Sequence, residues 1–512
     1  MSSLFTFFHR EHGASRAYLF SKLFLLMLAL DTWMLMIGHA GRYGVAGFNV
    51  AHFGWLDAIA PTPSARSYVA VLLLTGLLAL VVALTGIRRL PVLLLFLLYS
   101  YSWSMSMLDS YQHHYFVSLI LFCLVFFPET SALEIHPPPP SLDPDSRKRK
   151  HRVEQERGAR AERAGSIYVA SVLAITLAYA RIDSRGHTFV AFFLFAAAIG
   201  LATWYYGAER AAPLQRPGFG FSLLGATVAI VYTFTAIAKM DKNWVQGHTM
   251  LQISAAEQVF AGPAAFAARH GIDHDRFFSL LSTLVIPQEL ALAGCYLLAV
   301  HRDRMRSRLA SAICTLGFVL AVVLHVGAEA MGLQIGWFSY YMLALACCFL
   351  LPLLVVDKLA TVFTWPARFL LRATQEWESA GPIPRLGSLA LAVGCGLLLL
   401  LIGRMIDLPG SELACSVAAA VLLGTTLCSL YLTRARDPRR DAVATAIAAA
   451  GMWLALATSS VRWDFYRYLG GDQRRRGELD AALETYVHGE RYAPPGESRS
   501  AQIKELRQRL GR

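Results

Sequence analysis

Long apolar runs recur along the whole sequence and set the strongest limit on its fold. About thirteen of them have roughly 17 to 25 residues, the length that a helix needs to cross a hydrocarbon core of about 30 Å. A helix satisfies its own backbone hydrogen bonds in lipid, so we expect each run to be helical. The expected spans are 17–38, 67–86, 91–108, 115–128, 166–181, 188–206, 220–239, 277–300, 309–327, 337–356, 386–403, 412–433 and 442–461. The sequence therefore predicts an all-α polytopic membrane protein.

The composition supports a membrane protein over a soluble one. Hydrophobic residues make up 55% of the 512 residues and charged residues only 16%, whereas charged residues approach about a quarter of a soluble chain. The first apolar run carries Asp31 in its core and lacks a clear small-residue cleavage site, so we interpret it as an uncleaved anchor rather than a signal peptide.

The net charge of +12 predicts membrane orientation rather than nucleic-acid binding. Lysines and arginines are scattered through short loops instead of forming one basic face with stacking aromatics. They concentrate in alternate connections, which the positive-inside rule assigns to the cytoplasm together with the N-terminus. The loops 240–276 and 404–411, and the tail from about Arg462, are then expected on the outer side, either periplasmic or lumenal.

The remaining segments suggest further divisions of the chain. Residues 137–165, which begin "PPPPSLDPDS", predict a disordered basic loop. Residues 357–385 predict an interfacial linker, and three additional spans occupy 386–462. The tail 463–512 has the spacing of one tetratricopeptide repeat, at Leu469, Gly470, Gly477, Ala482, Tyr486 and Pro494. An amphipathic helical hairpin explains it as well, because a single repeat cannot bury its own faces.

Neither a metal site nor a disulfide framework is expected. All eight cysteines lie in the apolar runs and none shows C-x-x-C spacing, so they are interpreted as small core residues.

Several titratable residues fall where apolar runs reach the outer side. Lys239 ends the seventh expected span, His113 and His114 stand between the third and fourth, and His325 lies near the outer end of the ninth. Each also has a structural explanation, because a lysine at a helix end commonly reaches for the headgroups and a single histidine is commonly a packing residue. Their convergence at one membrane face favours acid–base chemistry.

The residues around Lys239 resemble a family signature. The sequence "AKMDKNW", which contains Lys239, Asp241 and Trp244, precedes "GHTM". It is similar to the K-L-D-A-D-W signature, with a glycine shortly after, of the vitamin K-dependent gamma-carboxylases and their bacterial relatives, the HTTM membrane family.

Other segments extend the resemblance over about residues 5 to 356. The segment "QHHYF", with His113 and His114, resembles the family's N-N-H-S-Y, and "IGWFSYYMLA" (335–344) resembles its I-G-x-F-S-Y-x-M-L-A. The opening "FHREHGASRAYLFSKL" and the stretch 56–76 are also similar. The resemblance implies that residues 1–356 form a carboxylase-like (HTTM) transmembrane bundle.

The reaction that this resemblance implies is carboxylation of glutamate. The hydroquinone of vitamin K, or a related quinone, is oxidised by O2 to an epoxide, while a glutamate in a peptide or protein loses a γ-proton and gains CO2. The enzyme would be a carbon–carbon lyase of the carboxylase type without a metal, and its partners would be a quinone, the glutamate-containing substrate and the lipid bilayer. A proton beside a carboxylate is too weakly acidic for any side chain, so the quinone must supply the strong base.

The family's roles transfer to matching positions. Lys239 aligns with the catalytic lysine base, a role that requires desolvation to favour the neutral amine. His114 aligns with the histidine that stabilises the quinone-derived anion. His113, His325, Asp241 and Trp244 are expected to surround the substrate or quinone, with Asp241 fixing the loop rather than reacting.

Departures from the family pattern leave a second function open. Met240, Lys242 and Asn243 replace parts of the signature, and His113 stands where the family has asparagine. The large lumenal domain of animal carboxylases is replaced by the extra spans and the tail. The alternative is a non-carboxylating HTTM membrane protein, such as a quinone or lipid binder or an assembly partner.

Overall fold

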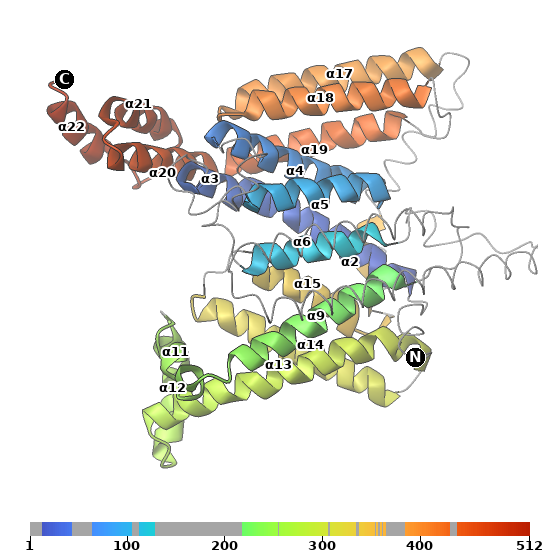
Figure 1. Cartoon of the computed structure of the whole chain (residues 1–512), viewed down its shortest axis with the longest axis vertical. Helices are drawn as coiled ribbons and strands as arrows, with labels where there is room; N and C mark the ends of the chain where they lie inside the picture. Colours follow the sequence, from blue (N-terminus) through green and yellow to red (C-terminus); the bar gives the residue numbers. More distant parts are fainter. Residues whose placement is uncertain are drawn as a thin grey trace, which may run out of the picture. The chain divides into compact units, whose positions relative to one another are not determined.

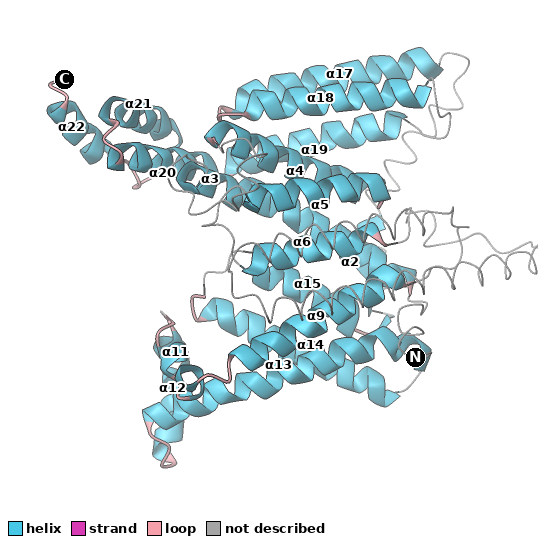
Figure 2. Cartoon of the chain, in the orientation of Figure 1, coloured by secondary structure: helices cyan, strands magenta, loops and turns pink. Residues whose placement is uncertain are grey.

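The computed structural model describes residues 13–43, 64–104, 112–127, 218–364 with short gaps, and 384–512 apart from 431–437. All regular secondary structure in these ranges is helical (Figure 2), which confirms the all-α expectation for the described part of the chain. The expected basic loop 137–165 and most of the linker 357–385 lie outside it. The chain divides into two compact units, residues 1–24 with 122–363 and residues 25–121 with 364–512. This grouping differs from the sequence-based boundary at residue 356.

The first unit is built around two long helices that pack along each other (Figure 1). These are α9 (Phe219–Ala238) and α13 (His274–Met305), and α13 also packs against α14 (Arg308–Ala330) and α15 (Phe338–Leu350). Three short helices connect α9 to α13: α10 (Lys242–Val245), α11 (His248–Leu251) and α12 (Ala256–Arg269). The unit also contains the start of α2 (Ala14–Asp31) and the end of α6 (Gln112–Val125).

Close helix approach in the first unit depends on small residues. A Cβ atom at Gly225 of α9 would lie 2.7 Å from the Val300 side chain, and one at Gly317 of α14 would lie 2.7 Å from the Cys295 sulfur. The ring of Phe221 stacks on that of Phe349 with 3.8 Å between centroids. The core is therefore close-packed and apolar, which makes its few polar side chains conspicuous.

The second unit combines membrane-type helices with the C-terminal tail. Its helices are the end of α2, the π-helix η1 (Thr32–Met36), α3 (Ile37–Tyr43), α4 (Ala65–Thr85), α5 (Arg89–Ser104), most of α6, α17 (Pro384–Ile406), α18 (Ser411–Cys428), α19 (Pro438–Thr458), α20 (Val461–Arg475), α21 (Leu479–Gly489), the 3₁₀-helix η5 (Glu490–Tyr492) and α22 (Ser500–Arg509). Helices α17, α18 and α19 pack together, and α18 and α19 both contact α4. The extra C-terminal helices are therefore integrated with N-terminal ones.

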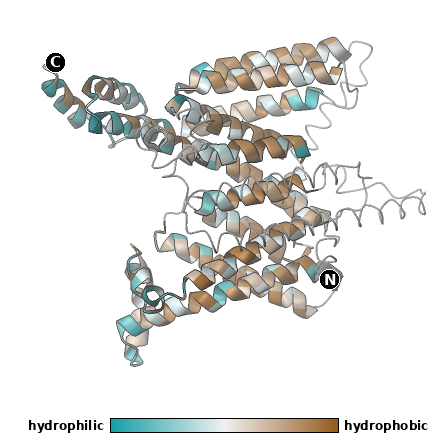
Figure 3. Ribbon diagram, viewed as in Figure 1, coloured by the Kyte–Doolittle hydropathy of each residue, from teal (hydrophilic) through white to brown (hydrophobic). Residues whose placement is uncertain are grey.

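Helix lengths agree with much of the predicted membrane topology. Eight described helices are long and apolar enough to cross a membrane, and three shorter apolar helices occupy the expected spans 91–108, 115–128 and 337–356. Figure 3 shows apolar residues along most of these helices and polar residues in the tail. The expected spans 166–181 and 188–206 lie outside the described residues, so the total of thirteen stays a prediction. The helices indicate a multi-pass membrane protein, and its orientation also stays a prediction.

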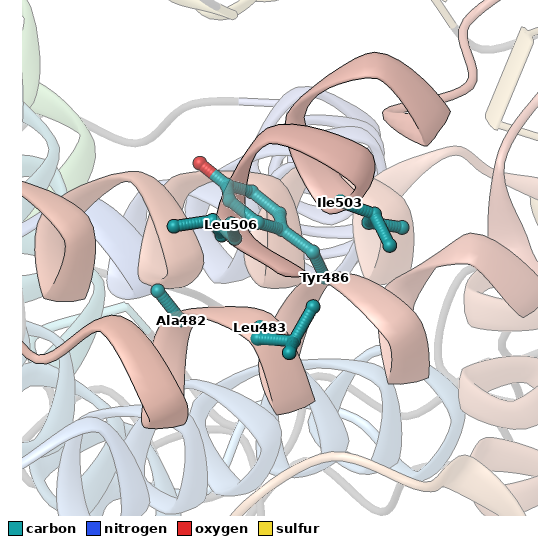
Figure 4. Packing of buried hydrophobic residues seen from close by; sticks show 5 residues of the cluster. All are labelled: Ala482, Leu483, Tyr486, Ile503 and Leu506. Atoms are coloured by element: carbon teal, nitrogen blue, oxygen red, sulfur yellow. The ribbon is translucent and has the colours of Figure 1, made fainter. Parts of the chain in front are cut away.

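The tail folds as a small helical layer with its own apolar core. Ala482, Leu483 and Tyr486 of α21 pack with Ile503 and Leu506 of α22 (Figure 4). A Cβ atom at Gly470 of α20 would lie 2.8 Å from the Tyr486 ring, so α20 and α21 meet at near-contact distance. Gly470, Ala482 and Tyr486 of this packing belong to the predicted repeat spacing. Helix α22 covers the apolar face that α20 and α21 alone would leave exposed.

The loop between α17 and α18 attaches to this tail through Asp407. Its carboxylate accepts hydrogen bonds from the Tyr492 hydroxyl and, at 2.9 Å, from His488 Nε2, and its backbone carbonyl accepts one from the Tyr466 hydroxyl at 2.6 Å. Burial and the nearby carboxylate of Asp407 raise the pKa of Tyr466, so its phenol remains a donor. Asp407 has a φ of 55°, a strained value that these contacts stabilise.

Adjacent glycines in α20 provide a matched test of the tail. We expect Gly470→Ala to destabilise the tail by about 1–3 kcal/mol, because the added methyl group overpacks against the buried Tyr486 ring. Gly471→Ala should be neutral or stabilising by up to about 1 kcal/mol, because alanine favours the helix and the nearest atom is 3.5 Å away. Limited trypsin digestion of the full-length protein would measure both, and equal cleavage rates would contradict the packing described.

Candidate functional site

A partly buried ion pair joins the end of α9 to the middle of α13. Lys239 Nζ lies 2.9 Å from Glu289 Oε1 and 3.1 Å from Oε2, and the side chains are 22% and 7% exposed. Glu289 is the sole charged residue in the apolar run 277–300. An isolated charge at such depth is costly, whereas a hydrogen-bonded pair offsets much of that cost. The pair is therefore the principal polar feature in this part of the apolar interface.

The segment after Lys239 is folded tightly by its own sequence. Asp241 caps α10, because its side chain accepts hydrogen bonds from the backbone N–H groups of Asn243 at 2.8 Å and Trp244 at 3.2 Å. Such caps contribute about 1 kcal/mol. Asp241 thus makes the local contacts expected of a residue that fixes the loop.

The same segment docks onto the first turns of α13. Trp244 Nε1 donates to the Ser282 carbonyl at 2.8 Å, and the Ser279 hydroxyl donates to the Val245 carbonyl at 2.8 Å. Gly247 has a φ of 82°, and a Cβ atom there would lie 2.7 Å from the backbone of Phe278. Only glycine combines this conformation with so close an approach.

Trp244 also contacts the ion pair. Lys239 Nζ lies 5.2 Å from the centre of a Trp244 ring, within the range of a cation–π interaction worth about 0.5–2 kcal/mol. The ammonium group therefore contacts both a carboxylate and an aromatic ring.

A second polar pair lies deeper, between α9 and α14. Tyr232, seven residues before Lys239 on α9, has its hydroxyl 2.8 Å from Nε2 of His325 on α14. The Tyr232 ring stacks on that of Tyr296, with 5.8 Å between centroids, and Tyr296 lies seven residues after Glu289 on α13. All three residues are buried. His325 is thus held in one orientation within an aromatic environment.

Two hydroxyl groups on α13 lack partners among the described residues. Ser282 Oγ and the Tyr296 hydroxyl are buried without a hydrogen bond, and the two residues flank Glu289 at intervals of seven on the same helix face. An unpaired buried hydroxyl costs about 1–3 kcal/mol. Water or a ligand with oxygen acceptors would satisfy these groups.

The other candidate residues lie in the second unit. His113 and His114 stand at the start of α6, with ring centroids 4.3 Å apart, and the Tyr99 hydroxyl is 2.9 Å from His114 Nδ1. Lys239, Asp241, Trp244 and His325 belong to the first unit. The meeting of the two groups at one site therefore stays a prediction.

Sequence reasoning missed Glu289, Tyr232 and Tyr296. A signal for Glu289 was present, because a lone carboxylate inside an apolar run is a strong indication of a functional or paired residue. No comparable signal marked the two tyrosines, since aromatic residues are common in membrane helices.

No group of three or more metal-ligating side chains occurs in the described part of the chain.

Comparison with known proteins adds no assignment. No family model, curated protein or solved structure matches this chain. The fold and the site therefore define a class, a multi-pass membrane protein with a charged pair between two of its apolar helices.

A double-substitution cycle tests the ion pair. Lys239→Met should destabilise the protein by up to about 3–5 kcal/mol, because it leaves the Glu289 carboxylate buried without its partner. Lys239→Met/Glu289→Gln should recover most of that loss, since neither charge remains. Thermal unfolding of the purified protein in detergent would measure both variants together with Glu289→Gln, the other single substitution of the cycle.

The control for this cycle is Lys242→Met, which removes an exposed lysine three residues further along the chain. It should leave the unfolding temperature unchanged. Additive effects of the two pair substitutions would show that Lys239 and Glu289 do not interact.

Proposed function

We propose that this chain is a quinol-dependent membrane enzyme similar to the vitamin K-dependent gamma-glutamyl carboxylases, with Lys239 and Glu289 together as its initial base. The observation that carries the proposal is the ion pair, which places two groups able to exchange a proton at an apolar boundary. The likeness of the sequence around Lys239, His113 and His114 to that family supplies the reaction class.

The surroundings of the pair suit an aromatic hydroquinone. Trp244, Tyr232 and Tyr296 offer aromatic surfaces, and the Ser282 and Tyr296 hydroxyls are buried donors without partners among the described residues. When bound, a hydroquinone supplies with O2 the strong base that removal of a glutamate γ-proton demands.

The pair can take up one proton by two equivalent routes. Glu289 accepts it directly, or the Lys239 amine accepts it after its own proton has moved along the 2.9 Å hydrogen bond to Glu289. Both routes end with an ammonium group on Lys239 and a carboxylic acid at Glu289. The proposed base is therefore the Lys239–Glu289 pair, whereas the family resemblance implied Lys239 alone.

After proton uptake, the positive charge that remains on Lys239 serves the next step, in which an anion is stabilised. Lys239 keeps its positive charge beside Trp244, where it stabilises an anion formed next to it. His325 is held in one orientation by its Nε2 contact with the Tyr232 hydroxyl. His114, hydrogen-bonded to Tyr99, would serve the anion-stabilising role that the family likeness implies.

The test is incorporation of labelled bicarbonate into a glutamate-rich peptide by purified protein with reduced vitamin K and O2. Glu289→Gln and Lys239→Met should each lower the rate by about 10²–10⁴-fold, the usual contribution of a positioned base. Lys242→Met should keep the full rate. The variant Lys239→Met/Glu289→Gln separates the roles, because it should be folded and inactive.

Other results point to other functions. Epoxide formation without label would indicate a quinol-oxidising enzyme without carboxylation, and full activity in the double variant would remove both residues from catalysis.

A second candidate function is a non-carboxylating quinone or lipid binder or an assembly partner. One observation favours it: Asp241, Trp244 and Gly247 each have a structural role, as cap, anchor and close contact. Their presence is explained without chemistry. Binding of reduced vitamin K without any product would support this candidate.

A further inference from the structure

Helix α12 lies in the connection between α9 and α13 and is apolar almost throughout. Its central ten residues, "VFAGPAAFAA" (259–268), contain no polar side chain. Its polar residues are Glu257 and Gln258 at one end and Arg269 at the other. A soluble surface helix shows charged or polar residues on its outward face, so α12 lacks the pattern of a helix in water.

One side of α12 is anchored to the protein. Ala256 and Ala267 are buried, and the Phe260 ring lies 6.4 Å from those of both Phe277 and Phe278 at the start of α13. This inner face closes over the cluster of Met250, Ala256, Phe278 and Met331, against which Trp244 also packs. The helix is therefore held beside the segment that carries the candidate site.

A second side of α12, about a quarter turn around the helix from the inner face, is exposed and apolar. Val259 and Phe266, seven residues apart on one helix face, are 38% and 59% exposed. Between them, a Cβ atom at Gly262 would meet nothing within 4 Å. Apart from the His270 ring, whose centroid lies 4.4 Å from that of Phe266, this outward face, Val259 to Phe266, is exposed within the described part of the chain.

Length and backbone chemistry place this helix at the membrane surface. Its 14 residues extend about 21 Å, too short to cross a hydrocarbon core of about 30 Å. Pro263 lies inside the helix and has no N–H, so the Val259 carbonyl lacks its usual helical donor. That carbonyl needs water or a polar headgroup nearby, which the hydrocarbon centre does not provide.

We propose that α12 lies in the membrane interface, with Val259 and Phe266 inserted among the lipid chains. The long helices that precede and follow this connection, α9 and α13, are both candidate spans, which keeps α12 near the bilayer. Acidic and basic residues both occur on the connection, as Asp241, Glu257, Lys242 and Arg269, so the binding rests on apolar burial rather than on anionic lipid. The inference does not depend on the proposed reaction.

The test uses a nitroxide spin label at position 266 in lipid nanodiscs. Phe266→Cys would be labelled in a Cys428→Ser background, which removes the exposed native cysteine. The label should collide more often with dissolved O2, which concentrates in lipid, than with a polar nickel complex. A label at Asp275→Cys, whose native side chain is 92% exposed, should show the reverse preference. Val259→Cys repeats the test if the first variant misfolds.

Two outcomes would overturn the proposal. Collision rates at 266 and 259 that match those at 275 would place the face in water. Strong dipolar broadening between labels at 266 would show that a second copy of the chain, rather than lipid, covers it.

Discussion

Lys239 and Glu289 form an ion pair at the edge of the expected hydrocarbon region, and the arrangement of α9 against α13 depends on this contact. Close apolar contacts such as Gly225 against Val300 set how α9 and α13 approach each other. The charged pair adds a further constraint on their register, since a shift would leave a charge without its partner. With Lys239 beside Glu289, an antiparallel arrangement brings Tyr232 level with Tyr296, as observed.

The short segment that follows Lys239 extends this fixed register to the surface. Asp241 caps α10, Trp244 reaches the Ser282 carbonyl, and Gly247 allows the backbone to touch α13. Each contact is local and modest in energy, but together they fix the position of the Lys239 side chain. The segment from Lys239 to Gly247 thus positions the lysine by means of several other residues. It is as long as it is because the cap, the anchor and the close contact each need a residue.

Much of the fold is predictable from the sequence because hydrocarbon accepts so few structures. Apolar length alone indicated helices such as α4, α14 and α17, whose bounds lie within a few residues of the expected ranges. Lys239 was predictable as a boundary residue for the same reason. Its partner was not, because hydropathy does not say which helix faces which. Glu289 was visible as a lone carboxylate, yet only the packing of α13 along α9 connects it with Lys239.

The tail shows the same division between pattern and contact. Its helical spacing was readable from Gly470, Ala482 and Tyr486, but the attachment of the Asp407 loop to His488 and Tyr492 was not. Residues 407 and 488 are far apart in sequence, because Asp407 lies in the loop between α17 and α18 and His488 lies in the last turn of α21. Side-chain hydrogen bonds between distant segments leave no periodic trace, so the attachment of this loop to the tail could not be anticipated.

A structural ion pair and a catalytic base make opposite demands on one lysine, and the low dielectric at the membrane boundary reconciles them. At rest the pair is neutral overall, which is the cheapest charge state where water is scarce. Uptake of a proton gives it a net positive charge, which is costly unless an anion forms in contact with it. In the function that we propose, proton uptake is therefore coupled to the presence of an acidic ligand. The contacts that make Lys239 and Glu289 stable without a ligand would then restrict their reactivity to the moment when one is bound.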